Sequence, residues 1–223
     1  AGAIVETMLR ANQMARSEPP GPVYVCLDAG LQEAALEEEI KIPDVSRFQP
    51  SEPPRASVDA VKETVDMLLG ASKPVIMIGR SGRSQEGWDN RIKLAELVGA
   101  GVFTNLRNAA VFPSDHLLHV GRPAGRITDT MRSTVTEADA ILSLNWLDFG
   151  GTQRLLTRDG ELKGKIVHCS MEEYVHNGFG GELFELPMAD VKITADHDAF
   201  VVQLIDEIEG RGATKGWDGN RVG

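Results

Sequence analysis

Two hydrophobic patterns alternate along the chain between residues 57 and 210: short continuous apolar runs, and longer stretches with apolar residues at helical spacing. Short runs of mainly apolar residues stand between Gly, Pro or charged positions, and such runs are typical of strands buried on both faces. These runs lie at residues 75–78, 102–104, 140–144, 165–169 and 191–194. The stretches between them are longer and several of them carry apolar residues at helical spacing, so strands and helices are expected to alternate.

The apolar residues of these stretches predict the buried faces of four helices. Ser57 is a suitable N-cap for the first helix. The predicted faces are Val58, Val61, Val65 and Leu68; Trp88, Ile92 and Ala95; Ile127, Met131, Val135 and Ala138; and Phe200, Val201, Leu204, Ile205 and Ile208. Alternation of this kind predicts an α/β fold, a Rossmann-like doubly wound parallel sheet of five or six strands with helices on both faces.

The remaining residues flank this domain on both sides. Residues 1–28 predict a helix with the apolar face Ile4, Met8, Ala11 and Ala15, followed by a buried strand at 23–27. Residues 29–56 are rich in Pro and Glu and predict a linker. Residues 211–223 are rich in Gly and predict a second linker, which leaves residues 57–210 as the packed domain.

Composition excludes several kinds of partner. The formal net charge is -10, which argues against nucleic acid and against an anionic membrane surface. No apolar stretch is long enough to cross a membrane, and no signal peptide is visible. Cys26 and Cys169 both lie in apolar runs, so we expect two buried free thiols and a cytoplasmic location.

The loop after the first strand of the domain is the best candidate for a ligand site. It precedes a helix, so its backbone amides and the helix dipole favour an anion, and two arginines add positive charge. The loop consists of Gly79, Arg80, Ser81, Gly82, Arg83 and Ser84. However, the glycines do not follow the dinucleotide fingerprint, and the second strand lacks the acidic residue that would bind a ribose. A tight turn that packs strand against helix is the favoured alternative.

Other candidate chemistry is weak. Asp115, His116 and His119 have spacing that suits a metal, but no second cluster supports them, so we predict no metal site. His168 lies in a predicted strand and is expected to be a core or edge residue. No nucleophile, paired carboxylates or phosphate-binding Walker loop is evident, so we predict no catalytic residue in this chain.

The order of these features resembles the thiamine diphosphate-dependent enzymes of the acetolactate synthase, benzoylformate decarboxylase and pyruvate decarboxylase superfamily. The resemblance is to the central domain with its flanks. The motifs that carry it are Gly21-Pro22-Val23-Tyr24-Val25, residues 73–79 (KPVIMIG), residues 95–102 (AELVGAGV), Phe112-Pro113-Ser114-Asp115-His116 with Gly121, and the pairs Ala138-Asp139 and Ala189-Asp190. It implies that residues 1–28 are the end of a pyrimidine-binding domain and that 211–223 lead toward a diphosphate-binding domain.

The resemblance also implies cofactors. In this superfamily thiamine diphosphate and Mg²⁺ are held by the pyrimidine- and diphosphate-binding domains, whose cofactor motifs do not occur in this chain. Some members carry FAD or ADP in the central domain. Ser170 stands where many members have an acidic residue, and the segment beginning at Asn145 lacks the Gly and Arg usual in flavin-binding members, so both departures argue against FAD. If a nucleotide binds, it should contact residues 79–84 and Asn145.

These observations lead to one main hypothesis and two alternatives. The chain is expected to be the central structural domain of a thiamine diphosphate-dependent 2-oxo acid decarboxylase, lyase or acetolactate synthase-like enzyme, inactive alone. Its expected partners are the pyrimidine- and diphosphate-binding domains and further copies in a homo-oligomer. The alternatives are a stand-alone module that binds ADP, FAD or NAD, and an unrelated Rossmann-like oxidoreductase.

Overall fold

A computed structural model describes residues 2–36, 38–157, 161–172, 185–213, 216, 217 and 219. The chain divides into two compact units, Ala1–Pro53 and Pro54–Gly223. The strands of the described residues all lie in the second unit, which therefore carries the candidate site.

Five parallel strands form the sheet of the second unit in the described residues. They are β1 (Pro74–Ile78), β2 (Gly101–Thr104), β3 (Ala140–Leu144), β4 (Lys165–Cys169) and β5 (Val191–Ile193). Their order across the sheet is β2-β1-β3-β4-β5, and Ile76 of β1 aligns with Val102 on one side and Leu142 on the other. All four strand pairs are parallel, which confirms the predicted fold class.

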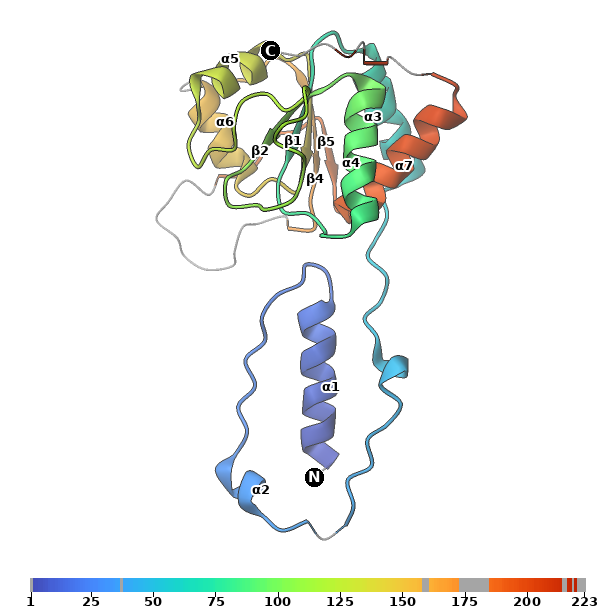
Figure 1. The fold of residues 1–223 in the computed structure, drawn as a ribbon, viewed down its shortest axis with the longest axis vertical. Coiled ribbons are helices and arrows are strands. Elements are labelled where there is room, and N and C mark those ends of the chain that lie inside the picture. The colour runs from blue at the N-terminus through green and yellow to red at the C-terminus, as the bar shows by residue number, and fades with distance from the viewer. Residues whose placement is uncertain are drawn as a thin grey trace. The chain divides into compact units, whose positions relative to one another are not determined.

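Helices cover both faces of this sheet, as Figure 1 shows. On one face, α3 (Val58–Gly70), α4 (Gln85–Val98) and α7 (His197–Gly210) enclose the larger apolar cluster. On the other face, α5 (Asp129–Glu137) and α6 (Phe149–Thr157) enclose a smaller one around Val75, Met77 and Ile141. Both faces are apolar because every strand between two helical layers must bury its alternate side chains on each side.

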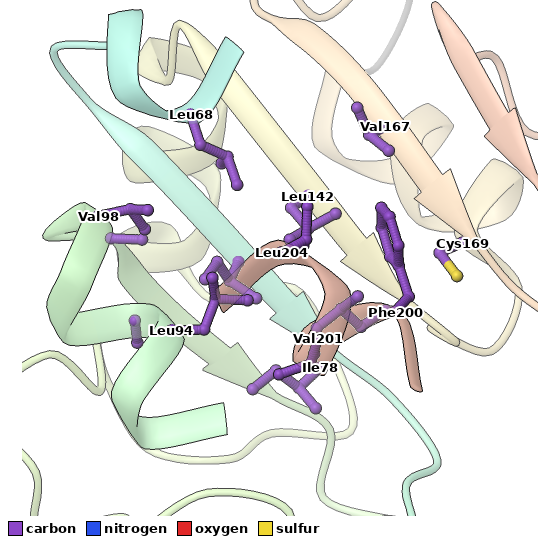
Figure 2. Packing of buried hydrophobic residues seen from close by; sticks show 14 of the residues in the cluster. Leu68, Ile78, Leu94, Val98, Leu142, Val167, Cys169, Phe200, Val201 and Leu204 are labelled. Carbon is purple, nitrogen blue, oxygen red and sulfur yellow. The ribbon is translucent and has the colours of Figure 1, made fainter. Parts of the chain in front are cut away.

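Helix α7 supplies much of the larger cluster (Figure 2). Phe200, Val201 and Leu204 project from α7 toward the strands and are fully buried. Burying one such side chain contributes about 1.5–3 kcal/mol, so this helix anchors the face. The face predicted for this helix is therefore correct.

The helix beginnings follow the predicted capping pattern. Ser57 caps α3 by accepting a hydrogen bond from the Ala60 amide, as expected from the sequence. Val58 was predicted on the buried face but is exposed, as the first residue of α3, and the buried face begins at Val61. In α4 the predicted Trp88 and Ile92 are only half-buried.

Helix α6 was not predicted. Its sequence includes Gly150 and Gly151, which lower helix propensity, so no clear helical period is visible. Tertiary packing stabilises it instead, through the buried Phe149 and Leu156. A side chain at Gly150 would meet the Glu185 backbone at 2.0 Å, so the small residue permits a close approach.

The described residues of the first unit form helices joined by irregular segments, with no sheet among them. It contains α1 (Gly2–Arg16), α2 (Ala29–Glu33) and the short 3-10 helix η1 (Val45–Phe48), and none of these has a buried residue. The buried strand predicted at 23–27 is wrong: the segment is not a strand, and Cys26 is exposed. A strand needs a neighbour for its backbone groups, and no described residue provides one here.

The segment predicted as the second linker is partly attached to the domain. The Gly216 amide donates to the Leu97 carbonyl over 3.3 Å, and Trp217 packs on the larger core cluster. The Trp217 ring also lies 5.1 Å from the His116 ring. Residues 214, 215, 218 and 220–223 of this segment lie outside the described residues.

Candidate functional site

The candidate loop lies where the strand order reverses. Strand β1 stands between β2 and β3, so the connections that leave β1 and β3 run to opposite faces. In open parallel sheets ligands bind at such a switch point, outside the carboxyl ends of the strands. Here the Gly79 amide donates to the Leu144 carbonyl (2.8 Å) and the Arg80 amide to the Asn145 carbonyl (3.2 Å). The predicted loop and Asn145 are thus brought together.

Asn145 joins the ends of three strands. Its side-chain amide donates to the Arg80 carbonyl (2.9 Å), its backbone amide donates to the Cys169 carbonyl (2.7 Å), and its Oδ1 accepts the Ser170 hydroxyl (3.0 Å). Its φ of 48° lies in the left-handed region, where Asn is better tolerated than most residues. Ser170 and Asn145, the two positions from which we argued against FAD, are therefore hydrogen-bonded to each other.

An internal carboxylate lies against the loop. Asp198, in the first turn of α7, accepts the Gly82 amide on Oδ2 (2.9 Å) and Arg91 Nη1 on Oδ1 (2.5 Å). Arg91 also donates from Nε to the Val111 carbonyl (2.8 Å) and from Nη2 to the Gly82 carbonyl (3.2 Å). Its side chain is 0% exposed, whereas that of Asp198 is 22% exposed. A buried guanidinium requires such a partner, since an unpaired buried charge is strongly unfavourable.

Three further residues of the loop, Arg80, Ser81 and Ser84, also have internal partners. Arg80 forms an ion pair with Glu172, which follows β4. Ser84 caps α4 by accepting the Gly87 amide on Oγ (3.1 Å). Ser81 Oγ donates to the Gly79 carbonyl (3.4 Å), and Arg83 is exposed.

A buried histidine stands beside Asp198. His197 Nε2 lies 3.8 Å from Asp198 Oδ1 and has no hydrogen-bond partner. Burial lowers the pKa of His197, and the positive charges of Arg91 and Arg80 act in the same direction, while Asp198 and Asp196 oppose it. The imidazole is therefore neutral at pH 7 and adds no positive charge to the loop.

A separate cavity of about 210 Å³ opens beyond the ends of β2 and β3. Arg107 and Arg126 line it together with Trp146 and Asp148. Burial raises the pKa of Asp148, although its carboxylate accepts the Gly151 amide at the start of α6 (3.0 Å). The Trp146 indole donates to Thr152 Oγ1 (2.9 Å), so these two polar groups of the lining bind each other.

Asp115, His116 and His119 have a spacing that suits a metal, but the described residues contain no group of three His, Cys, Asp or Glu side chains able to hold an ion. His116 Nε2 lies 3.1 Å from Glu96, and His119 Nε2 lies 2.9 Å from Thr104 Oγ1. His168, predicted as a core or edge residue, is buried and its Nδ1 lies 2.9 Å from Ser143 Oγ. No described helix has the length and hydropathy needed to cross a membrane.

Comparison with known proteins decides the family. The sequence model described as "Thiamine pyrophosphate enzyme, central domain" matches residues 61–204, which is more than half of the chain. The chain belongs to this family. The resemblance inferred from the sequence motifs is thus confirmed, as is the assignment of this domain to the central domain of these enzymes.

Two curated relatives of this central domain illustrate its range. The chain is 27% identical over 154 residues to an acetolactate synthase of Mycobacterium avium, a match covering 69% of this chain and 23% of the relative. It is 31% identical over 121 residues to a glyoxylate carboligase of Escherichia coli O157:H7, covering 54% of this chain and 20% of the relative. The chain thus spans about a quarter or less of the length of these relatives.

Solved structures share the fold of this central domain. A benzoylformate decarboxylase from Polynucleobacter necessarius matches with a TM-score of 0.63 and 16% identity, covering 89% of this chain and 35% of that one. A thiamin diphosphate-dependent enzyme described as putative, from Mycobacterium smegmatis, matches with a TM-score of 0.67 and 16% identity, covering 97% of this chain and 38% of that one. At this identity the likeness concerns the fold.

Sequence reasoning missed the residues that fill the loop of this central domain. Arg91 lies at helical spacing with the buried Leu94, Ala95 and Val98, so its place in an apolar stripe was a readable signal. Asp198 gave no such signal, since an acidic residue in the first turn of a helix is ordinary. Only the packing of α7 against α4 brings the two together.

Proposed function

We propose that this chain is the central structural domain of a thiamine diphosphate-dependent enzyme of the 2-oxo acid decarboxylase, lyase or acetolactate synthase-like kind. The match of residues 61–204 to the central-domain family carries the proposal. In such an enzyme the domain spaces the pyrimidine- and diphosphate-binding domains and contributes to contacts between subunits. The cofactor, when bound by those domains, supplies an electron sink for making or breaking a bond next to a carbonyl.

The described residues of this chain do not fit thiamine diphosphate or Mg²⁺. Mg²⁺ takes oxygen ligands such as carboxylates, and no cluster of three His, Cys, Asp or Glu side chains exists among the described residues. The carboxylate at the candidate loop, Asp198, is paired with Arg91 instead. We therefore place the cofactor and its metal in the partner domains and derive no chemical step from this chain.

The four segments have distinct roles in this proposal. Residues 1–28 belong with a pyrimidine-binding domain, 29–56 form a linker, 57–210 form the central domain, and 211–223 lead toward a diphosphate-binding domain. The exposure of apolar residues in the first unit supports this, since Tyr24 is 91% exposed and helix α1 buries none of its residues. Such residues gain stability when a partner covers them. We also propose a homo-oligomer in the cytoplasm, where the two free thiols would stay reduced.

A nucleotide-binding module is the weaker alternative. The relatives and solved structures do not favour it, and FAD or ADP in the central domain has no support from them. If a nucleotide were accepted, we would still place its phosphates at residues 79–84 and Asn145. The internal partners of Arg80, Gly82 and Ser84 argue against that outcome.

An activity assay tests the proposed function. The 223-residue chain is incubated with thiamine diphosphate, Mg²⁺ and a panel of 2-oxo acids, alongside an intact acetolactate synthase as positive control. We expect no turnover above the protein-free blank and no rise in melting temperature on adding the cofactor. Turnover by the chain alone would overturn its assignment as a structural domain.

A further inference from the structure

The strongest unassigned feature is the carboxylate that fills the candidate anion loop. Loops between a strand and a helix at the switch point hold phosphates through free amides, helix dipole and basic side chains. This chain has the loop, the helix α4 and an arginine in place, but the anion comes from its own helix α7. Asp198 provides it, bonded to the Gly82 amide and to Arg91.

We propose that Asp198 is a built-in substitute for a phosphate group, which makes it the residue that determines whether this domain accepts nucleotides. The inference deepens the proposed function and rests on it in one respect, namely that the domain works without a bound nucleotide. It assigns the exclusion of phosphate-bearing ligands to one side chain. A phosphate at the Gly82 amide would meet the Asp198 charge at hydrogen-bond distance.

The geometry of the loop supports this exclusion. A side chain at Gly82 would have its Cβ only 2.6 Å from Asp198 Oδ2, so the carboxylate lies directly against the loop backbone. Gly87, in the first turn of α4, would place a Cβ 3.4 Å from the same oxygen. The carboxylate therefore lies beside the first turn of α4, close to the helix end where a phosphate would profit from the helix dipole.

Positive charges next to the loop are compensated by carboxylates of the same chain. Arg91 is fully buried and neutralised by Asp198, and Arg80 is paired with Glu172. His197 packs next to Asp198, and its Nε2 has no hydrogen-bond partner. Arg91 and Arg80 are thus paired with carboxylates of this chain, whereas Arg83 of the loop is exposed.

Titration with phosphate compounds tests the proposal. The probes are inorganic pyrophosphate and ADP, added to the 223-residue chain, and the readouts are calorimetry and the NMR shift of the Gly82 amide. Asp198→Asn keeps the shape of the side chain but removes its charge. We expect the wild type to bind neither probe at millimolar concentration, and the variant to bind pyrophosphate at least about tenfold more tightly, since a like-charge contact is removed. ADP binding beyond that of pyrophosphate would show that the nucleoside is recognised as well.

A matched control is Asp196→Asn. Asp196 lies two positions earlier and caps α7 through the Ala199 amide, so this variant has the same change of net charge. It should bind no better than the wild type. An equal gain in pyrophosphate affinity for both variants would show that only net charge matters and would overturn the proposal. Tight binding of pyrophosphate by the wild type would also overturn it. So would binding that leaves the NMR shift of the Gly82 amide unchanged.

A second variant covers the case in which folding is affected. Asp198→Ala leaves Arg91 without its carboxylate, and we expect pyrophosphate to raise its melting temperature by several degrees more than that of the wild type. If pyrophosphate does not stabilise Asp198→Ala more than the wild type and does not bind Asp198→Asn more tightly, Asp198 does not exclude phosphate from this loop. None of these results bears on turnover of 2-oxo acids, so failure here is distinguishable from failure of the proposed function.

Discussion

The Ser170 hydroxyl donates a hydrogen bond of 3.0 Å to Asn145 Oδ1 and so links the ends of β3 and β4. The same hydroxyl accepts the Glu172 amide (3.0 Å), and Glu172 in turn pairs with Arg80. The chain positions that follow β1, β3 and β4 are therefore held in one network. Polar groups that take part in this network are not available to bind a ligand.

Gly79 tests how closely this network is packed. A Cβ at this position would lie 1.9 Å from the Asn145 carbonyl oxygen, and the backbone there cannot withdraw without breaking the bonds to Arg80. We expect Gly79→Ala to lower the free energy of unfolding by about 3 kcal/mol or more, measured by urea denaturation. The control is Gly70→Ala at the end of α3, where no atom lies within 4 Å and a change of at most about 1 kcal/mol toward greater stability is expected. Equal effects of the two changes would contradict the close approach.

The buried ion pair should matter far more than a surface pair on the same helix. Arg91→Ala removes the partner of Asp198 and the bond to the Val111 carbonyl, so we expect a loss of about 3–5 kcal/mol in urea denaturation. Lys93 pairs with Glu209 on the exposed side, and Lys93→Ala should cost less than about 1 kcal/mol. A loss below about 1 kcal/mol for Arg91→Ala would show that the pair is not a buried one.

His168 predicts a pH dependence of stability. Burial lowers the pKa of His168 to about 4, with a smaller contribution from the charge of Lys192, while in the unfolded chain it is near 6.5. Below pH 6.5 the unfolded state binds a proton that the folded state does not, so stability should fall as the pH drops from about 6.5 to about 4, by up to about 3 kcal/mol. Denaturation curves between pH 4 and 7.5 measure this. His168→Asn can still bond to Ser143, and its stability should fall less steeply as the pH drops. An unchanged slope would show that other titrating groups cause the loss of stability.

The two thiols should differ strongly in reactivity. Cys26 is exposed, whereas Cys169 is buried and burial raises the pKa of its thiol to about 12. Since the thiolate is the reactive form, we expect one thiol to react rapidly with a disulfide reagent at pH 8 and the other only after denaturation. Cys26→Ser should abolish the rapid phase. A rapid phase that persists in this variant would mean that Cys169 is accessible.

Removal of the first unit should leave the second unit folded. Residues 54–56 are bound to α7, since the Pro54 carbonyl accepts the Asp196 amide (3.0 Å) and Ala56 exchanges two hydrogen bonds with Gln203. A chain that begins at Pro54 retains these bonds, and its melting temperature should lie within about 3 °C of that of the whole chain. Cooperative loss of structure in the shortened chain would place part of the first unit in the core.

The sequence by itself determined the fold class, the five strands of the described sheet and the family. Strands buried on both faces give unbroken apolar runs, and helices that cover them show a 3.6-residue period, so both are readable without neighbours. The sequence also predicted that the loop 79–84 follows one strand and precedes a helix, as it does between β1 and α4, whereas Asn145 was named only through the family resemblance. Helix α6 escaped notice because its stability comes from packing around Gly150 and Gly151.

Only the tertiary structure decided what occupies the loop. Asp198 and Gly82 are far apart in the chain, and their hydrogen bond exists because α7 packs beside α4. The same is true of residues 23–27, which have the sequence of a buried strand but form none, since a strand requires a neighbour and no described residue supplies it. Local patterns record how a segment prefers to fold, whereas partners across the chain fix which polar groups stay open to a ligand.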